Sequence, residues 1–297
     1  MDVLVERLAK NFGNFRAVDE VSFEVEEGEI FGLLGPNGAG KTTVVMILAT
    51  LLKPSSGRAF VAGHDVVKEA SKVRKKIGIV FQETTLDLEL TAKENLDFHA
   101  RLYGLKRGER EERIREVLEL VELSDKANVA VKKFSGGMKR RLEIARGLLH
   151  TPRVLFLDEP TLGLDAISRR TIWDYIAKLR ENATIFLTTH YIEEAERLCD
   201  RVAIMNRGKI VAIDKPEKLI DSAGSVVVLE GEGIEKLEKH LSYSFRISGN
   251  SIRIYVKNGS KALPEIISIA NDVGVRIESV KVERRSLEDV FIQLTKS

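Results

Sequence analysis

Short apolar runs recur between residues 30 and 206, separated by longer stretches whose apolar residues have helical spacing. The runs at 30–34, 77–81, 153–158, 184–188 and 201–206 have the length of buried strands. Strands that alternate with helices form a largely parallel sheet with helices on both faces. The pattern therefore predicts an α/β core.

Two other segments interrupt this alternation. Residues near 2–8, 16–25 and 57–62 alternate between apolar and polar positions, which predicts an antiparallel β-subdomain. Residues from about 85 to 148 are mostly helical in pattern, which predicts a helical subdomain. Within it, the charged run 106–113 is predicted to open a helix and to face solvent.

The pattern changes after residue 215. Strand-like and helix-like segments then follow in the order β-α-β-β-α-β: 225–230, 234–241, 243–248, 251–257, 261–273 and 275–282. Gly249-Asn250 suits a hairpin turn, and Ser286 suits the N-cap of a last helix, 286–294. This order predicts a ferredoxin-like α+β domain at 223–297, after a first domain at 1–222.

The first predicted strand of the core leads directly into a glycine-rich loop. Residues 35–42 read GPNGAGKT, which matches the phosphate-binding pattern G-x-x-x-x-G-K-[ST] between a strand and a helix, here expected at about 41–52. Glycines let successive backbone N–H groups turn around phosphate oxygens, and the helix N-terminus adds a positive dipole. Lys41 could then reach the β- and γ-phosphates, and Thr42 could ligate magnesium. The loop predicts that the chain binds a nucleoside triphosphate.

A second strand ends in two acids. The run Val154–Leu157 is followed by Asp158 and Glu159. Neighbouring side chains on a strand point to opposite faces, so Asp158 could hold a magnesium ion through water while Glu159 faces an attacking water. The alternative, a strand followed by an ordinary polar turn, is less consistent with the phosphate loop upstream.

A serine and two glycines open a helix between these motifs. Residues 134–138 read FSGGM, and Ser135 suits an N-cap. Adjacent glycines weaken a helix, so an ordinary amphipathic helix does not explain them. Exposed N–H groups beside a serine hydroxyl form an anion site, which need not serve the chain's own phosphate loop.

Together these segments resemble the ATP-binding cassette family, the motor subunits of ABC transporters. The family's landmarks occur in its order over residues 1 to about 222: an aromatic for adenine, Walker A, the Q-loop glutamine, the signature, Walker B, the D-loop and the switch histidine. In this chain they match Phe12, residues 35–42, Gln82, FSGGM, VLFLDEP, Asp165 and His190. Met138 replaces the signature glutamine, but the phosphate-facing residues before it are intact. The segment 84–96 looks most like the ABC-2-type exporters, the multidrug and daunorubicin-resistance-like branch.

The resemblance implies a set of site residues. ATP would be bound by Phe12, Gly35, Pro36, Asn37, Gly38, Ala39, Gly40, Lys41, Thr42, Thr43, Gln82, Ser135, Gly136, Gly137 and Asp165. Glu159, His190 and Lys41 would be catalytic, and Thr42, Gln82 and Asp158 would serve the magnesium ion, Asp158 through water.

The resemblance also implies an assembly. Two cassettes would face each other head to tail, as a homodimer or a pair, so that Ser135 and Gly137 of one cap the γ-phosphate held by Lys41 of the other. The membrane would be spanned by separate permease subunits. The chain would then be an ATPase at the inner, cytoplasmic face of the cell membrane, held there by its partner.

Composition agrees with this interpretation. Hydrophobic residues make up 43% and charged ones 31%, and the net charge of +2 argues against a dedicated nucleic-acid binder. No apolar leader and no run of eighteen apolar residues is found in the sequence. The single Cys199 excludes an internal disulfide and fits a reducing cytosol. The alternative is a soluble cassette ATPase acting on ribosomes or DNA, although such proteins usually fuse two cassettes or insert coiled coils or zinc modules.

Overall fold

The computed structural model describes residues 1–296, which divide into two compact units. The first is Met1–Asp214, and the second begins at Lys215. Helix α8 (Pro216–Ser222) therefore belongs to the second unit, whereas the sequence placed the domain boundary just after it. Within residues 1–296, no helix is both long enough and apolar enough to cross a membrane.

A six-stranded sheet forms the centre of the first unit, as the apolar runs predict. Its order is β10-β9-β3-β8-β7-β6, from strands β3 (Ile30–Leu34), β6 (Ile77–Val80), β7 (Val154–Asp158), β8 (Thr184–Thr189), β9 (Arg201–Asn206) and β10 (Lys209–Asp214). All neighbours are parallel except β9 and β10. Strand β10 was not predicted from the sequence. It follows a turn at Arg207 and Gly208, both of which have a positive φ, as in a tight hairpin.

A second, antiparallel sheet packs against the same core. It consists of β1 (Val3–Phe12), β2 (Phe15–Val25), β4 (Ser56–Val61) and β5 (His64–Asp65), in the order β2-β1-β4-β5. One apolar cluster joins residues of β1, β2 and β4 to Phe31, Phe156 and Phe186 of the parallel sheet. The Phe31 and Phe186 rings stack with centroids 5.5 Å apart. The two sheets are therefore held by a common core.

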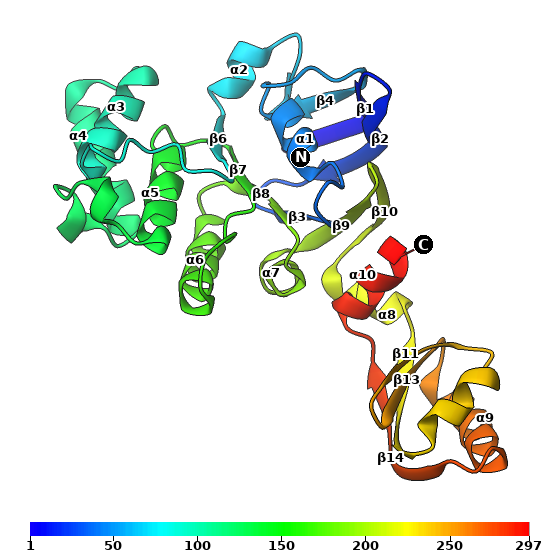
Figure 1. The fold of residues 1–297 in the computed structure, drawn as a ribbon. Coiled ribbons are helices and arrows are strands. Elements are labelled where there is room, and N and C mark those ends of the chain that lie inside the picture. The colour runs from blue at the N-terminus through cyan, green and yellow to red at the C-terminus, as the bar shows by residue number, and fades with distance from the viewer. Residues whose placement is uncertain (297) are drawn as a thin grey trace. The chain divides into compact units, whose positions relative to one another are not determined.

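Helices surround these sheets: α1 (Lys41–Leu48), α2 (Ala70–Arg74), α3 (Ala92–Leu102), α4 (Arg107–Leu120), α5 (Gly136–Leu148), α6 (Ala166–Leu179) and α7 (Ile192–Leu198). Figure 1 shows α3, α4 and α5 grouped together, away from the antiparallel sheet, which is the predicted helical subdomain. The charged start of α4 is exposed as predicted, except at Arg110 and Arg113. The Arg110 side chain is only 12% exposed and pairs with Asp97, and Arg113 donates to the carbonyls of α5's last residues.

Helix α1 ends four residues earlier than the sequence indicated, at Leu48 rather than near Leu52. Thr50 takes a left-handed conformation with φ 66°, and its N–H donates to the Ile47 carbonyl. The Leu51 N–H donates to the Met46 carbonyl. These two bonds form a Schellman motif, which usually has glycine where Thr50 stands, so no sequence signal marks the stop.

The second unit has the predicted ferredoxin-like plan, with one change. Its antiparallel sheet has the order β12-β13-β11-β14, from β11 (Ser225–Glu232), β12 (Ser244–Ser248), β13 (Ser251–Val256) and β14 (Arg276–Arg284). Helix α9 (Gly259–Asp272) covers one face, and α10 (Leu287–Lys296) follows β14 and packs on α8. The first predicted helix is instead a 3-10 segment, Ile234–Lys239.

A stacked trio of rings lies between α3 and the end of α5. Tyr103 stacks on His150 with centroids 3.7 Å apart, and His99 lies 5.1 Å from Tyr103. Burial is the main cause that lowers the pKa of His99 to about 4, with the positive charge of Arg146 adding to it. At neutral pH His99 is therefore uncharged in the folded protein.

This shift predicts that the free energy of unfolding decreases as the pH is lowered from about 6.5 to about 4. In that window the unfolded chain binds a proton on His99 that the folded chain does not, so acid favours unfolding. Urea titrations at a series of pH values give the slope of the free energy of unfolding against pH. At pH 5 this slope corresponds to about one proton taken up on unfolding by His99, and His99→Phe should remove it. The exposed His240→Phe is the matched control. An unchanged slope in His99→Phe would contradict the assignment.

Candidate nucleotide-binding site

A pocket of about 470 Å³ gathers much of the predicted site. It is lined by Phe12, Phe15, Ala17, Asn37, Gly38, Ala39, Gly40, Lys41, Thr42, Thr43, Gln82, Glu159 and Leu162. The hairpin between β1 and β2 supplies Phe12, which is half exposed, and the loop between β3 and α1 supplies the predicted phosphate binders. The structure thus brings the aromatic, the glycine loop, the glutamine and the acid to one cavity.

Two glycines of the loop are required by close backbone contacts. Gly40 has φ 103°, and a Cβ there would lie 2.3 Å from the Ala17 carbonyl oxygen. A Cβ on Gly35 would lie 2.4 Å from the Met205 carbonyl oxygen. Only glycine fits at either position, so the loop can turn tightly into α1.

Lys41 is buried at the start of α1 and is held by the loop itself. Its Nζ donates to the carbonyl oxygens of Gly35 at 2.8 Å and Pro36 at 3.1 Å, and lies 3.3 Å from a carboxylate oxygen of Glu159. Burial lowers the pKa of Lys41, and the negative charge of Glu159 opposes that shift. The ammonium group is thus already positioned at the loop that would receive phosphates.

Asp158 ends β7 beside the first turn of α1. One of its carboxylate oxygens accepts hydrogen bonds from the hydroxyls of Thr42, at 3.2 Å, and Thr188 on β8. Burial raises the pKa of Asp158, while both hydroxyls favour its charged form. Oxygens of Thr42 and Asp158 therefore lie together, as a magnesium site requires.

Glu159 follows at the end of β7 in a strained backbone conformation. Its φ is 47°, which is rare for a residue with a side chain, and its N–H donates to the Thr188 carbonyl at 3.1 Å. The carboxylate lies between Lys41 and His190, with the His190 Nδ1 at 3.0 Å. The acid, the lysine and the histidine predicted as catalytic thus form one contiguous group.

Ser135, Gly136, Gly137 and Asp165 do not line this pocket. Ser135 caps α5 by accepting from the Met138 N–H, and Asp165 caps α6 by accepting from the N–H groups of Ile167 and Ser168. These hydrogen bonds, chiefly from Ser168, lower the pKa of Asp165. The two caps are neighbours, because a Cβ on Gly137 would lie 3.2 Å from the Ser168 hydroxyl. The signature and D-loop residues form a separate surface.

Arg140 links the predicted motifs, and the sequence analysis did not single it out. Its buried guanidinium donates to the carbonyl oxygens of Phe81, Asp158, Glu159 and Pro160 and to the Glu143 carboxylate. It therefore ties α5, which begins at the signature, to the residue before Gln82 and to the end of β7. The sequence signal was weak, because Arg140 stands in a run of three basic residues that looks exposed.

Glu194 on α7 was also missed. It is fully buried and accepts hydrogen bonds from the Thr161 hydroxyl at 2.8 Å and the Trp173 indole N–H at 2.9 Å. Burial raises the pKa of Glu194. The buried Trp173 therefore helps to fix the helix that follows His190. Cys199, at the end of the same helix, is buried.

Comparison with known proteins identifies both units. Residues 18–162 match the family model "ABC transporter", and residues 220–295 match "ATP-binding protein DrrA1-3-like, C-terminal domain". The chain is 40% identical to the daunorubicin resistance ATP-binding protein DrrA2 of Streptomyces coeruleorubidus, over 99% of this chain and 94% of that protein. It is 38% identical to the Nod factor export ATP-binding protein I of Rhizobium etli, over 97% and 91%.

Solved structures agree with the fold of the first unit. The dimeric post-hydrolysis state of the ATP-binding cassette MJ0796 bound to ADP and Pi matches with a TM-score of 0.64 and 30% identity, over 72% of this chain and 98% of that one. The ADP conformation of the cassette MJ1267 matches with a TM-score of 0.68 and 26% identity, over 73% and 92%. The solved structures confirm the predicted cassette fold. The match of residues 220–295 and the similarity to DrrA2 confirm the daunorubicin-resistance-like branch indicated by residues 84–96. The chain belongs to the ATP-binding proteins of ABC transporters, in the branch with a DrrA1-3-like C-terminal domain.

Proposed function

We propose that this chain is the ATP-hydrolysing subunit of an ABC exporter and works as a head-to-tail pair of cassettes. The observation that carries the proposal is the division of the ATP site. The pocket holds the phosphate loop and Glu159, while the Ser135–Gly137 surface and Asp165 lie outside it. A second cassette would complete the site with its own Ser135 and Gly137. The cassette MJ0796, which matches this unit, has a dimeric structure.

Each predicted site residue has a separate role in ATP binding or hydrolysis. Phe12 stacks on the base, and residues 35–43 with Lys41 hold the phosphates. Glu159 accepts a proton from the attacking water, and His190 holds Glu159 and the γ-phosphate in position. In the structure Lys41 pairs with Glu159, so phosphates that draw the ammonium group away would also free the base.

A magnesium ion fits the same pocket. Residues 1–296 contain no cluster of three or more His, Cys, Asp or Glu side chains able to bind a metal alone. Magnesium commonly uses one or two protein oxygens together with substrate phosphates and waters. Thr42, Asp158 (through water) and Gln82 supply such oxygens, and the ion would neutralise charge on the phosphates.

The transport partner would be a pair of multi-span permease subunits at the inner face of the cell membrane. The similar proteins named for daunorubicin resistance and Nod factor export support an export role. We therefore expect the chain to sediment with membranes that contain its permease and to remain in the supernatant without it. Sedimentation with ribosomes or DNA in both cases would instead favour the soluble cassette ATPase.

Lys41→Ala tests the catalytic half of this proposal, when ATP binding and hydrolysis are measured beside membrane sedimentation. It removes the cation held in the loop and leaves the backbone N–H groups, so ATP binding should weaken and hydrolysis should fall about 10²–10³-fold. Membrane sedimentation should not change, because the fold and the permease contacts remain. The exposed Lys209→Ala is the matched control and should hydrolyse ATP normally. Unchanged hydrolysis in Lys41→Ala would refute the role of the loop.

A further inference from the structure

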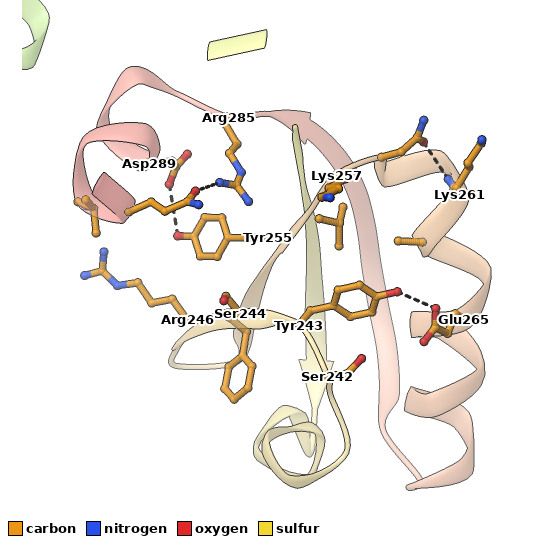
Figure 2. Close-up of a pocket in the computed structure, with 16 residues that line it drawn as sticks. Ser242, Tyr243, Ser244, Arg246, Tyr255, Lys257, Lys261, Glu265, Arg285 and Asp289 are labelled. Carbon is orange, nitrogen blue, oxygen red and sulfur yellow. Dashed lines mark hydrogen bonds between the residues drawn. The ribbon is translucent and has the colours of Figure 1, made fainter. Parts of the chain in front are cut away.

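The second unit contains a groove that the ATP site does not explain. Its volume is about 990 Å³, and it lies where β12 begins and β13 ends, between α9 and α10 (Figure 2). The lining residues are Ser242, Tyr243, Ser244, Phe245, Arg246, Tyr255, Val256, Lys257, Asn258, Lys261, Ala262, Glu265, Arg285, Asp289, Ile292 and Gln293. This volume is at the upper end of the range for pockets that bind small molecules.

The groove carries an excess of positive charge. Four cationic side chains and two carboxylates line it, and both carboxylates are engaged. Glu265 accepts from the Tyr243 hydroxyl at 2.6 Å, and Asp289 accepts from the N–H and hydroxyl of Ser286, each at 3.0 Å. By contrast, Arg246, Lys257 and Lys261 are exposed and form no ion pair within residues 1–296.

Arg246 lies in an unfavourable place for a cation. On the β12–β13 ladder it stands directly opposite Arg253, and like charges at that position destabilise a sheet. Arg253 is compensated by Glu283 at 3.2 Å and by Asp289 at 3.7 Å. Arg246 has no such neighbour among the described residues, so an anion in the groove would relieve the repulsion.

Arg285 is the buried cation of the groove. Only 8% of it is exposed, and its Nε has no hydrogen-bond acceptor within residues 1–296. Its Nη1 donates to Gln293, and its guanidinium carbon lies 5.0 Å from the centre of the Tyr255 ring. Burial lowers the pKa of Arg285, and the negative charge of Asp289 opposes that shift. Figure 2 shows Arg285 and Arg246 on opposite sides of Tyr255.

We propose that this groove binds a small organic anion, with its carboxylate or phosphate held by Arg285, its planar part packed on Tyr255 and its charge also attracted by the exposed Arg246. Guanidinium groups bind both anions through charge-assisted hydrogen bonds. The phenol ring of Tyr255 provides a flat wall for a ring. The site is separate from the phosphate loop, and the proposal does not depend on the function assigned to the first unit.

The test uses the full chain with saturating Mg·ADP, so that the phosphate loop is filled. Phenyl phosphate and benzoate are titrated separately, and the arginine Nε–Hε signals are followed by NMR. The Arg285 signal should shift and saturate. Arg285→Met should weaken binding about tenfold or more, since a charge-assisted pair is removed. Saturation with phenyl phosphate alone identifies a phosphate ligand, and saturation with benzoate as well identifies a general anion site.

Two further variants keep the proposal testable if Arg285→Met does not fold. Arg246→Gln, on the exposed edge strand, should weaken binding several-fold. Arg276→Gln is the matched control, an exposed arginine of the same sheet that does not line the groove. No saturable shift with either probe in the wild-type chain would overturn the proposal. Equal weakening in Arg246→Gln and Arg276→Gln would also overturn it, because it would indicate diffuse attraction to the surface.

Discussion

Glu159→Gln is expected to bind ATP normally and to hydrolyse it about 10²–10⁴-fold more slowly. Glutamine keeps the size of the side chain and one oxygen near Lys41 and His190, but it cannot accept the proton of the attacking water. It also removes one negative charge beside the γ-phosphate, so ATP should be held at least as tightly. Single-turnover hydrolysis and an equilibrium binding titration measure the two effects separately. The exposed neighbour of Gln82, changed as Glu83→Gln, is the control.

The same variant should form a dimer that bound ATP stabilises. If Ser135 and Gly137 of one cassette cap the γ-phosphate held by the other, unhydrolysed ATP stabilises the pair by mass action. Size-exclusion chromatography should give a dimer with ATP and a monomer with ADP. Adding Ser135→Arg should abolish the dimer and leave ATP binding to each monomer. A Glu159→Gln chain that stays monomeric in saturating Mg·ATP would contradict the proposed closure, and one that hydrolyses at the wild-type rate would exclude Glu159 as the base.

Arg140→Met should strongly destabilise the folded protein. Both Arg140 and its partner Glu143 are at most 6% exposed. Removing the guanidinium therefore takes a donor from four carbonyl groups and leaves the buried Glu143 carboxylate with only the Thr85 N–H. Breaking a buried ion pair in this way costs about 3–5 kcal/mol. For a domain of this size that lowers Tm by roughly 2–4 °C per kcal/mol, a shift that calorimetry resolves easily.

A double variant separates the lost charge balance from the lost positioning. Arg140→Met combined with Glu143→Met removes both buried charges, so much of the stability should return. The rate of ATP hydrolysis should not return, because nothing then ties α5 to the carbonyl groups of Asp158 and Glu159. Arg141→Met, whose guanidinium contacts Val121 and Tyr175 instead, is the matched control for rate. Full recovery of hydrolysis in the double variant would show that Arg140 acts only through stability.

The sequence predicted the parts of the site whose geometry is local. Residues 35–42 could be recognised because their glycines and Lys41 form a fixed pattern within eight residues. The contacts of Gly40 with Ala17 and of Gly35 with Met205 appear only in the structure. The apolar strands and the order of elements in both units were predicted because burial leaves a periodic pattern. The role of Arg140 could not be predicted in this way, because its five partners come from segments up to 59 residues away.

The errors also have physical causes. Helix α1 ends because Thr50 takes a left-handed conformation. Strand β10 follows a turn in which Arg207 stands before Gly208, where asparagine or aspartate is typical. Most of the charged start of α4 is exposed as expected, but Arg110 pairs with Asp97 on α3. In each case a tertiary contact or an uncommon backbone conformation outweighed the local pattern.

The common core of the two sheets has a mechanical consequence. The hairpin with Phe12 grows from one sheet and the phosphate loop from the other, and both sheets are anchored in the same tightly packed cluster around Phe31 and Phe186. Close-packed interiors resist compression and shear, so the spacing between hairpin and loop is set when the protein folds. A nucleotide bound as proposed, with its base on Phe12 and its phosphates in the loop, would therefore meet a fixed distance between these two parts of its site.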